Sequence, residues 1–373
     1  MMQEYDLERK KIIENLFKEK EKEMMREAFE QILNFNKTPI EIKNFFDKYI
    51  VGQEEAKKVM ATAIAFHYRR VGQAIKKEIE KNNGDFDLAL KNATTPKANI
   101  LLIGPSGCGK TYTAEKAAQI VNVPFVKEDL TKFSETGYVG RDLSEIAIDL
   151  LNESKNNFYL ASVGIVYLDE IDKITAVYTI GRDVSGLGVQ NGLLKLVEGA
   201  DNFIQSPLGN IPFSTKHVLF IASGAFEGLD VIVKGRLERQ KVKLDGKNWQ
   251  DYLLTYDLVS YGMSRQLMGR FPVRVFYNQL TKDDLISIMK KSEDSPLKAY
   301  INDFKDWDIE LSFTRGALEK IAEFAEKEGV GARGLTGILN KILLEYMYQL
   351  PGNYKGELKI DKEYVNKKLK NDN

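Results

Sequence analysis

The segment Asn99–Thr111 reads Asn-Ile-Leu-Leu-Ile-Gly-Pro-Ser-Gly-Cys-Gly-Lys-Thr and is the most informative stretch of the chain. Its four apolar residues, Ile100–Ile103, are typical of a buried parallel strand. Gly104–Thr111 then fits the pattern G-x-x-x-x-G-K-[ST], and a helical pattern follows over Tyr112–Ile120. A strand, a glycine-rich loop and a helix in this order predict a P-loop, which binds a nucleoside triphosphate.

The residues of this loop have the chemistry that a triphosphate requires. Its glycines let the main chain wrap around a phosphate, with N–H groups pointing inward at the start of the helix. Lys110 supplies a positive charge for the outer phosphates, and the Thr111 hydroxyl suits Mg²⁺. We therefore expect ATP and Mg²⁺ as cofactors. The predicted nucleotide contacts are Pro105, Ser106, Gly107, Cys108, Gly109, Lys110, Thr111 and Tyr112.

Composition narrows the class of protein. The 373 residues are 43% hydrophobic and 29% charged, which is ordinary for a globular protein. Lys plus Arg equals Asp plus Glu at 54 each, so no basic excess favours a nucleic-acid partner. There is no run of 18 apolar residues, and the N-terminus lacks the apolar core of a secretory signal. We expect a cytoplasmic protein without a membrane or nucleic-acid partner.

Short apolar runs alternate with helical patterns through most of the chain. The runs that predict strands are Ile100–Ile103, Pro124–Val126, Gly164–Leu168, Val218–Ala222 and Val273–Tyr277. Strands separated by helices predict an α/β fold, a parallel sheet with helices on both faces. After Asn278 the periodicity becomes helical, at Leu285–Met289, Ala317–Ala325 and Leu335–Tyr348. A small, mostly α-helical C-terminal domain is expected there.

Three segments are predicted from these changes in pattern. Residues 1–38 form a charged N-terminal extension whose apolar pairs predict a long amphipathic helix, and docking on the protein's own body is favoured over contact with a partner. Residues 39–277 form the large α/β domain, and residues 278–373 form the small helical one. Lys81–Lys97 is predicted to be a loop.

A second motif completes the chemistry of ATP hydrolysis. Ile165–Asp172 reads Ile-Val-Tyr-Leu-Asp-Glu-Ile-Asp, an apolar strand that ends in two acids. At such a strand end Asp169 is predicted to hold Mg²⁺ through water. Glu170 is predicted to orient and deprotonate the attacking water, as general base.

With both motifs in place, residues 40–352 closely resemble the ClpX and HslU unfoldases of the AAA+ superfamily. The matching segments are Tyr49–Lys58 before the P-loop, Gly137–Gly140, Gly181–Gln190 with Leu193–Gly199, Phe220–Phe226, Met268–Pro272 and Gly331–Leu335. The resemblance implies an AAA+ fold and a ring, a hexamer, because it makes Arg270 an arginine finger that reaches a neighbour's nucleotide. A planar, permanently charged guanidinium suits a γ-phosphate.

The resemblance also assigns residues to the other motifs. It implies that Ile50 and Val51 contact the adenine and that Tyr138 and Val139 grip the substrate polypeptide. It places sensor 1 at Ser223 and sensor 2 at Arg333. Together with Lys110 and Glu170, Arg270 would then make up the catalytic group.

These residues predict an ATP-dependent unfoldase that threads polypeptide through a pore, with a ClpP- or HslV-type peptidase as a candidate partner. One alternative is a non-translocating, ATP-dependent assembly switch or scaffold, and a weaker one is a nucleic-acid motor. The first alternative predicts ATP turnover that is indifferent to unfolded protein, and the second predicts salt-sensitive DNA binding.

The chain departs from both relatives at several points. Only about 25 residues separate Gly140 from Ile165, so the large inserted domain of HslU is absent. The four cysteines of the ClpX zinc domain are absent as well, since Cys108 is the only cysteine. The region 230–251 has no Ile-Gly-Phe-like tripeptide, and the C-terminus is polar, unlike the HslU tail. Docking motifs for a peptidase are therefore not evident.

Cys108 has two interpretations that the sequence leaves open. The favoured one is a small residue in a tight loop. The other is a redox-sensitive thiol whose pKa is lowered by neighbouring amides and Lys110. His67 and His217 have no cysteine or acidic ligand spacing and are expected to be structural.

Overall fold

The computed structural model describes residues 2–133, 143, 145–175, 186–199, 201–206 and 209–370. The chain divides into two compact units. The first comprises Met1–Ile42, Val59–Leu102 and Ala114–Val275, and the second comprises Lys43–Lys58, Ile103–Thr113 and Phe276–Asn373. The glycine-rich loop and Lys43–Lys58 therefore belong to the same unit as the C-terminal helices. The predicted domain limits at residues 38 and 277 remain predictions.

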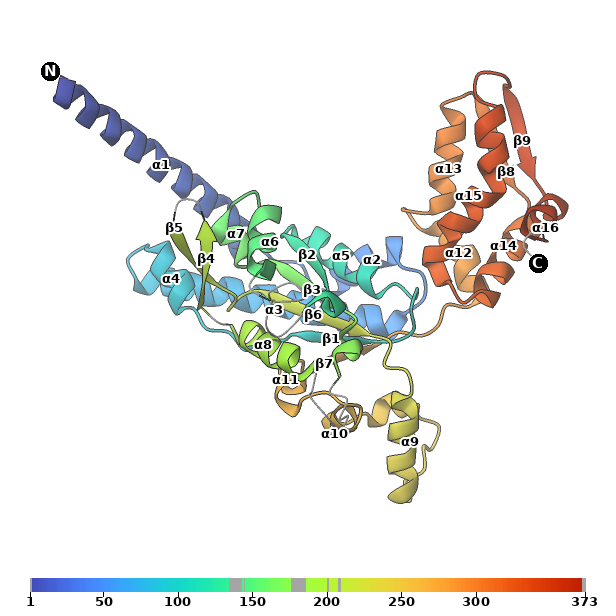
Figure 1. Cartoon of the computed structure of the whole chain (residues 1–373), viewed down its shortest axis with the longest axis horizontal. Coiled ribbons are helices and arrows are strands. Elements are labelled where there is room, and N and C mark those ends of the chain that lie inside the picture. Colours follow the sequence, from blue (N-terminus) through green and yellow to red (C-terminus); the bar gives the residue numbers. More distant parts are fainter. Residues whose placement is uncertain are drawn as a thin grey trace. The chain divides into compact units, whose positions relative to one another are not determined.

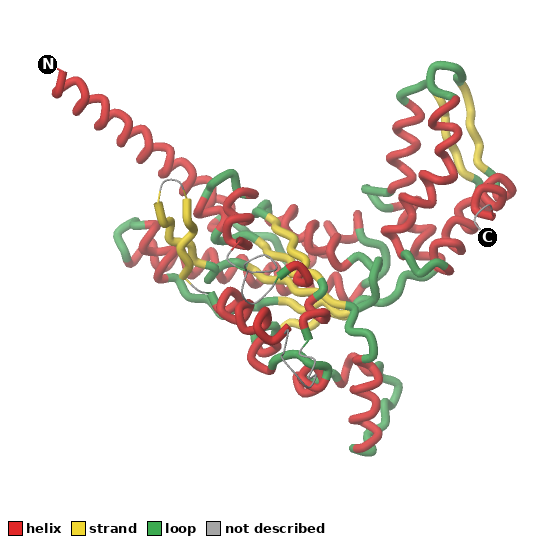
Figure 2. Tube along the Cα trace, viewed as in Figure 1, coloured by secondary structure: helices red, strands yellow, loops and turns green. Residues whose placement is uncertain are grey.

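A five-stranded sheet forms the core of the first unit (Figures 1 and 2). Its spatial order is β2 (Phe125–Asp129), β3 (Ile165–Asp169), β6 (Leu219–Gly224), β1 (Ile100–Ile103) and β7 (Val273–Phe276). The strands β2, β3 and β6 are parallel, with Ile165 opposite both Phe125 and Leu219. Every residue of β1 and β6 is buried, which explains their uninterrupted apolar runs. The five predicted strands are confirmed.

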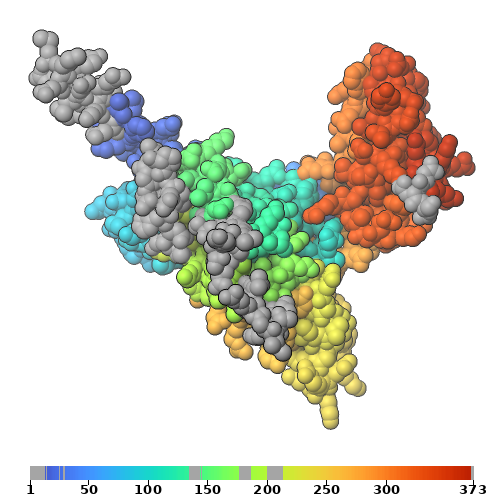
Figure 3. All heavy atoms as spheres, viewed as in Figure 1, coloured from blue at the N-terminus to red at the C-terminus, as the bar shows by residue number. Residues whose placement is uncertain are grey.

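Helices pack on this sheet, and one hairpin lies beside it. The helices of this part are α3 (Glu54–Lys81), α5 (Lys110–Val121), α6 (Glu145–Glu153), α7 (Phe158–Ala161), α8 (Gly186–Glu198), α9 (Leu229–Arg239), α10 (Thr255–Ser260) and α11 (Arg265–Gly269), with 3₁₀ turns η1 (Leu130–Lys132), η2 (Ile171–Ile174) and η3 (Trp249–Tyr252). The hairpin joins β4 (Asp201–Ser206) to β5 (Gly209–Ser214) in antiparallel register. In Figure 3 the segment from α9 through η3 (yellow) projects from the surface of this unit.

The predicted loop over Lys81–Lys97 is wrong in its middle, where α4 (Phe86–Asn92) forms. Its N-cap is Asp85, whose carboxylate accepts a hydrogen bond from the Leu88 amide at 2.9 Å. This satisfies one of the free amides of the first turn, and Ala89 is buried on the inner face. The turn residues before Asp85 concealed a helix of only seven residues.

The predicted N-terminal helix is α1 (Met2–Leu33), followed by α2 (Pro39–Tyr49). The C-terminal part of α1 packs on its own unit: Ile32 is buried, and the Asn157 amide donates to the Met24 carbonyl at 3.2 Å. Further toward the N-terminus, Leu16 and Phe17 are exposed. Docking on the body is therefore seen for the end of the helix that leads into α2.

The second unit contains a helical bundle with a small sheet. It comprises α12 (Lys282–Lys291), α13 (Pro296–Lys305), α14 (Arg315–Lys327), α15 (Gly331–Gln349), α16 (Lys362–Lys370) and the parallel pair β8 (Ile309–Phe313) and β9 (Gly356–Ile360). Buried residues such as Leu285, Ile321 and Leu339 form its core. The mostly helical C-terminal region is confirmed, with two strands that the helical periodicity did not indicate. Within the described ranges, none of the helices has the length and apolarity to span a bilayer.

Candidate functional site

The P-loop connects β1 to α5 and packs against the start of α15, all within the second unit from Ile103 onward. Gly107 has φ +74°, and a Cβ there would lie 2.8 Å from the Val330 carbonyl oxygen. The Ala332 amide donates to the Gly107 carbonyl at 3.1 Å. Glycine is required at this position because a side chain would collide with the neighbouring backbone.

Lys110 lies at the first turn of α5 and folds back over the loop. Its ammonium donates to the carbonyls of Gly104 at 2.6 Å and Pro105 at 2.7 Å. A cation and the free amides of a helix N-terminus are thereby held beside one another, the arrangement that attracts phosphate.

Cys108 does not have the environment of a redox-sensitive thiol. Its side chain is buried, and its Sγ donates to the Pro105 carbonyl at 2.9 Å. Burial raises the pKa of this thiol, and the opposing effect of Lys110 is smaller. The less favoured interpretation, a thiol with a lowered pKa, is therefore wrong, because desolvation of the thiolate outweighs the nearby cation. Cys108 is a small residue in a tight loop.

The predicted adenine segment is bonded to the beginning of the C-terminal bundle. Ile50 is buried and Val51 half-buried. The side chain of Gln53 makes two bonds to the main chain of Asn278: Nε2 donates to its carbonyl at 2.7 Å, and Oε1 accepts from its amide at 2.9 Å. The Ser292 hydroxyl also donates to the Tyr49 carbonyl at 2.9 Å. These bonds fix the main chain on either side of Ile50 and Val51.

Arg333, the predicted sensor 2, lies in the first turn of α15 and is exposed. It immediately follows Ala332, the residue bonded to the P-loop at Gly107. Tyr112, at the start of α5, donates its hydroxyl to Asp294 at 2.7 Å. The second unit thus brings together the P-loop, the Ile50–Val51 segment and Arg333.

The first unit carries Asp169 at the end of β3, where three side chains surround it. Asp169 Oδ1 accepts from the Ser223 hydroxyl at 2.7 Å and from the Tyr167 hydroxyl at 3.4 Å. The hydroxyls of Tyr167 and Ser223 are 2.6 Å apart. Lys127 Nζ lies 3.6 Å from Asp169 Oδ2. The predicted sensor 1 residue and the predicted Mg²⁺ ligand are therefore in direct contact.

Sequence reasoning missed Tyr167 and Lys127, although a signal for Lys127 exists. In the parallel register of β2 and β3, Asp129 is opposite Asp169 and Lys127 is opposite Tyr167. A lysine two residues before a strand end lies on the same face as the strand's last residue. The pairing of β2 with β3 was needed to connect that face with Asp169.

Glu170 has an unusual backbone conformation. Its φ is +59°, in the left-handed region, and its side chain is exposed. This conformation costs a non-glycine residue about 1–2 kcal/mol. Residues held in it cluster at functional sites. The turn η2, which follows Glu170, is held in place because the buried Asp172 carboxylate accepts a hydrogen bond from the Phe226 amide at 3.1 Å. Glu170 is thus turned out of the strand next to Asp169.

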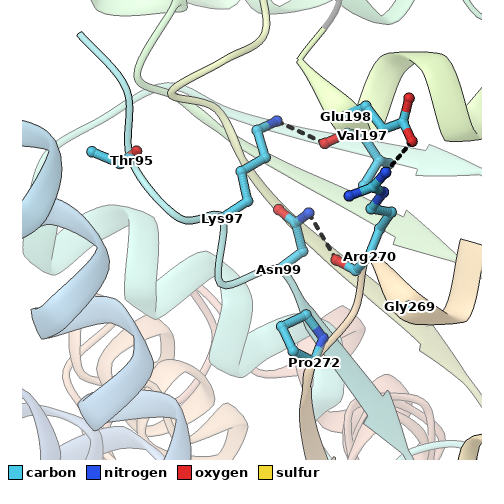
Figure 4. Close-up of a pocket in the computed structure, with 8 residues that line it drawn as sticks. All are labelled: Thr95, Lys97, Asn99, Val197, Glu198, Gly269, Arg270 and Pro272. Atoms are coloured by element: carbon cyan, nitrogen blue, oxygen red, sulfur yellow. Dashed lines mark hydrogen bonds and ion pairs between the residues drawn. The ribbon is translucent and has the colours of Figure 1, made fainter.

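Arg270 follows α11, and its guanidinium forms an ion pair with Glu198 at the end of α8, with Nη2 and Oε1 2.5 Å apart (Figure 4). Both side chains are exposed and line a cavity of about 260 Å³. The Asn99 amide donates to the Arg270 carbonyl at 3.0 Å. Arg270 is therefore an exposed cation on a fixed main chain.

Lys97 lines the same cavity and was not singled out from the sequence. Its ammonium donates to the carbonyls of Val197 and Thr215, both at 2.8 Å, and lies 4.9 Å from the centre of the Phe220 ring. Burial lowers the pKa of Lys97 to about 7. Lys97 joins the end of α8 to the segment that leads into β6.

Tyr138 and Val139, the predicted gripping residues, lie outside the described residues, as do residues 181–185. His67 and His217 are buried, and each ring contacts a main-chain carbonyl: His67 Nε2 that of His217 at 3.2 Å, and His217 Nε2 that of Leu90 at 3.1 Å. Burial lowers the pKa of both histidines, that of His67 to about 3. In the described parts of the chain, no three His, Cys, Asp or Glu side chains are grouped as a metal site.

Comparison with known proteins identifies both regions. A family model described as AAA domain (Cdc48 subfamily) matches residues 95–274, and one described as the C-terminal, D2-small domain of ClpB protein matches residues 280–364. The ClpX ATP-binding subunit of the ATP-dependent Clp protease from Borrelia duttonii is 37% identical over 92% of this chain and 81% of its own. Those of Treponema denticola and Bacteroides thetaiotaomicron are 36% and 35% identical, over 89% and 90% of this chain and 81% and 82% of theirs.

Proposed function

Since this chain belongs to the ClpX family of AAA+ ATPases, we propose that it hydrolyses ATP in a hexameric ring and threads polypeptides through the central pore. The single observation that carries the catalytic part is the end of β3, where Glu170 is turned outward next to a hydrogen-bonded Asp169. Phosphoryl transfer depends mainly on positioned charges, and this strand end supplies two of them.

Nucleotide binding is assigned to the second unit. The amides of the P-loop and Lys110 would hold the phosphates. Ile50 and Val51 would contact the adenine base, and Arg333 would sense the outer phosphate. For Lys110, phosphate oxygens would compete with the carbonyls of Gly104 and Pro105, which are uncharged acceptors. Hydrogen bonds to a charged acceptor are stronger than those to a neutral one, so we expect the Lys110 ammonium to bind the phosphate in preference to the two carbonyls.

Mg²⁺ and the attacking water are assigned to Thr111, Asp169 and Glu170. The hydroxyl of Thr111 and the carboxylate of Asp169 are oxygen donors of the kind that Mg²⁺ prefers, and Mg²⁺ usually keeps several waters. Bound to the nucleotide, the ion would neutralise charge that develops on the phosphates. Glu170 would accept the proton of the attacking water.

Arg270 is proposed to act on the nucleotide of a neighbouring subunit. It is an exposed guanidinium at the end of a short helix, and it cannot lose its charge. If it acts in trans, hydrolysis requires the ring. Tyr138 and Val139 would push the substrate by apolar contact that does not depend on its sequence. A peptidase of the ClpP or HslV type is the proposed partner.

ATP turnover with and without an unfolded protein tests this proposal. We expect stimulation in the wild type, loss of stimulation in Tyr138→Ala, and no turnover in Glu170→Gln, which keeps the size of the side chain but not its basicity. Nucleotide binding by Glu170→Gln is the control for folding. Turnover that ignores both the unfolded protein and the change at Tyr138 would instead support an assembly switch.

A further inference from the structure

The helix that precedes Arg270 is fastened to α8 at both ends. At its start, the main-chain amide of Ser264 donates to Oε1 of the buried Gln190 side chain at 2.6 Å. At its end, the Arg270 guanidinium donates to Glu198 at 2.5 Å. Gln190 Nε2 also donates to the carbonyl of Ile174, which follows the acidic end of β3, at 2.7 Å. The helix α8 therefore contacts both the turn η2, which follows Glu170, and the segment that carries Arg270.

The main chain on each side of the Glu198–Arg270 pair is fixed independently of the pair. Asn99, 1% exposed, holds the Arg270 carbonyl and accepts from the Phe220 amide at 3.2 Å. Lys97 holds the carbonyl of Val197, the residue before Glu198 (Figure 4). The remaining freedom of Arg270 is therefore in its long side chain, which Glu198 contacts.

The pair is poorly suited to stabilise the fold. The Arg270 side chain is 53% exposed and that of Glu198 is 41% exposed. Ion pairs this exposed add little to stability, because water screens the charges and ordering two long side chains costs entropy. The pair does select one orientation of the guanidinium. Since that group has five N–H donors, it can contact a carboxylate and a phosphate oxygen together.

We propose that Glu198 is a positioning residue for Arg270, orienting the guanidinium toward the nucleotide held by a second copy of this chain. This inference rests on the proposed role of Arg270 in trans. Small errors in the placement of a catalytic charge are costly, and a displacement of about 1 Å can lower a rate by about a hundredfold. Removing the carboxylate should therefore slow hydrolysis and leave the nucleotide site of the same subunit intact.

The test compares ATP turnover of the full chain for Glu198→Ala, Glu198→Gln and Arg270→Ala. For Glu198→Ala we expect kcat to fall about tenfold, with the affinity for ATP within about twofold of the wild type. Glu198→Gln, whose amide oxygen still accepts a hydrogen bond, should recover part of the loss. Glu319→Ala is the matched control, since Glu319 forms an exposed pair with Arg315 at 2.8 Å in the other unit and should leave turnover unchanged.

The double variant separates positioning from a structural role. In the Arg270→Ala background, Glu198→Ala should cause no further loss of turnover, because the group it orients is gone. An additional loss there, or a fall in thermal stability larger than that of Glu319→Ala, would overturn the proposal in favour of a structural role.

Two further outcomes distinguish this inference from the proposed function. Normal kcat in Glu198→Ala, together with inactive Arg270→Ala, would overturn the positioning role and leave the trans-acting arginine in place. Full turnover in Arg270→Ala would overturn the trans-acting role, and the role of Glu198 with it.

Discussion

At the scale of single residues, Ser223 occupies a central place in the acidic site. Its hydroxyl is fully buried, donates to Asp169 and lies within hydrogen-bond distance of Tyr167. A carboxylate that binds a metal ion is oriented by such hydrogen bonds, and loss of one commonly costs ten- to a hundredfold in metal affinity or activity. Ser223 thus links the predicted sensor 1 position to the proposed Mg²⁺ ligand Asp169.

Ser223→Ala is expected to raise the Mg²⁺ concentration needed for half-maximal ATP turnover by about tenfold, because Asp169 loses the donor that orients it. The measurement is a Mg²⁺ titration of turnover at saturating ATP. Ser260→Ala, at an exposed serine that ends α10, should have no effect. An unchanged Mg²⁺ requirement in Ser223→Ala would show that Asp169 does not need this hydrogen bond.

At the scale of elements, a buried ion pair connects α9 to α10. Arg236 Nε donates to Asp257 Oδ1 at 2.7 Å, and Arg236 Nη2 donates to Asp257 Oδ2 at 3.0 Å. The Arg236 side chain is 9% exposed, and that of Asp257 is not exposed at all. A second bond from Nη2 reaches the Tyr252 carbonyl at 2.7 Å. This pair holds the projecting segment of α9 and η3 to the rest of its unit.

Arg236→Met is expected to lower the free energy of unfolding by about 3–5 kcal/mol, because it leaves Asp257 as a buried, unpaired charge. Urea denaturation measures the change. On the same helix, Asp230→Asn removes the exposed partner of Lys234 and should cost no more than about 1 kcal/mol. If both substitutions lowered the free energy of unfolding equally, burial would not be what makes the Arg236–Asp257 pair important for stability.

At the scale of the whole molecule, stability should depend on pH through the two histidines. Burial lowers the pKa of His67 to about 3 and also lowers that of His217. In the unfolded chain a histidine has a pKa of about 6.5. Below that pH the unfolded chain binds more protons than the folded one, so stability is present above pH 6.5 and falls as the pH decreases toward 3.

Because His67 stays neutral in the folded protein, the free energy of unfolding should be about 2 kcal/mol lower at pH 5 than at pH 7.5. Thermal unfolding at several pH values between 5 and 7.5 measures this loss. His67→Gln, which keeps a nitrogen donor for the His217 carbonyl but does not titrate, should flatten the profile. The same slope in wild type and His67→Gln would assign the pH dependence to other groups.

The sequence predicted those parts of the molecule whose determinants are local. Ile100–Ile103 and Ile165–Asp169 were identifiable because a fully buried strand requires consecutive apolar residues, and the glycine-rich loop because phosphate binding requires a continuous pattern. The hairpin β4–β5 was missed because polar residues interrupt its strands, so neither strand has a long run of consecutive apolar residues. Parallel strands β8 and β9 were missed because 42 residues, including two helices, separate Phe313 from Gly356.

Contacts between distant residues account for the remaining differences. The Glu198–Arg270 pair joins residues 72 positions apart, and the contact between Ser223 and Asp169 spans 54 positions. Such pairs depend on how helices and strands pack, which periodicity does not encode. For Cys108 the sequence left two interpretations open for a related reason: it shows the neighbour Lys110 but not the degree of burial that raises the pKa of the thiol.

The left-handed backbone of Glu170 has a consequence for protein engineering. Glycine and asparagine tolerate φ +59° better than glutamate, so either residue at this position would relieve strain in the fold. A library selected for heat resistance alone would therefore tend to replace the proposed general base and enrich variants that we expect to be inactive. Selection on ATP turnover as well as melting temperature would be needed to keep the ATPase active while its stability is improved.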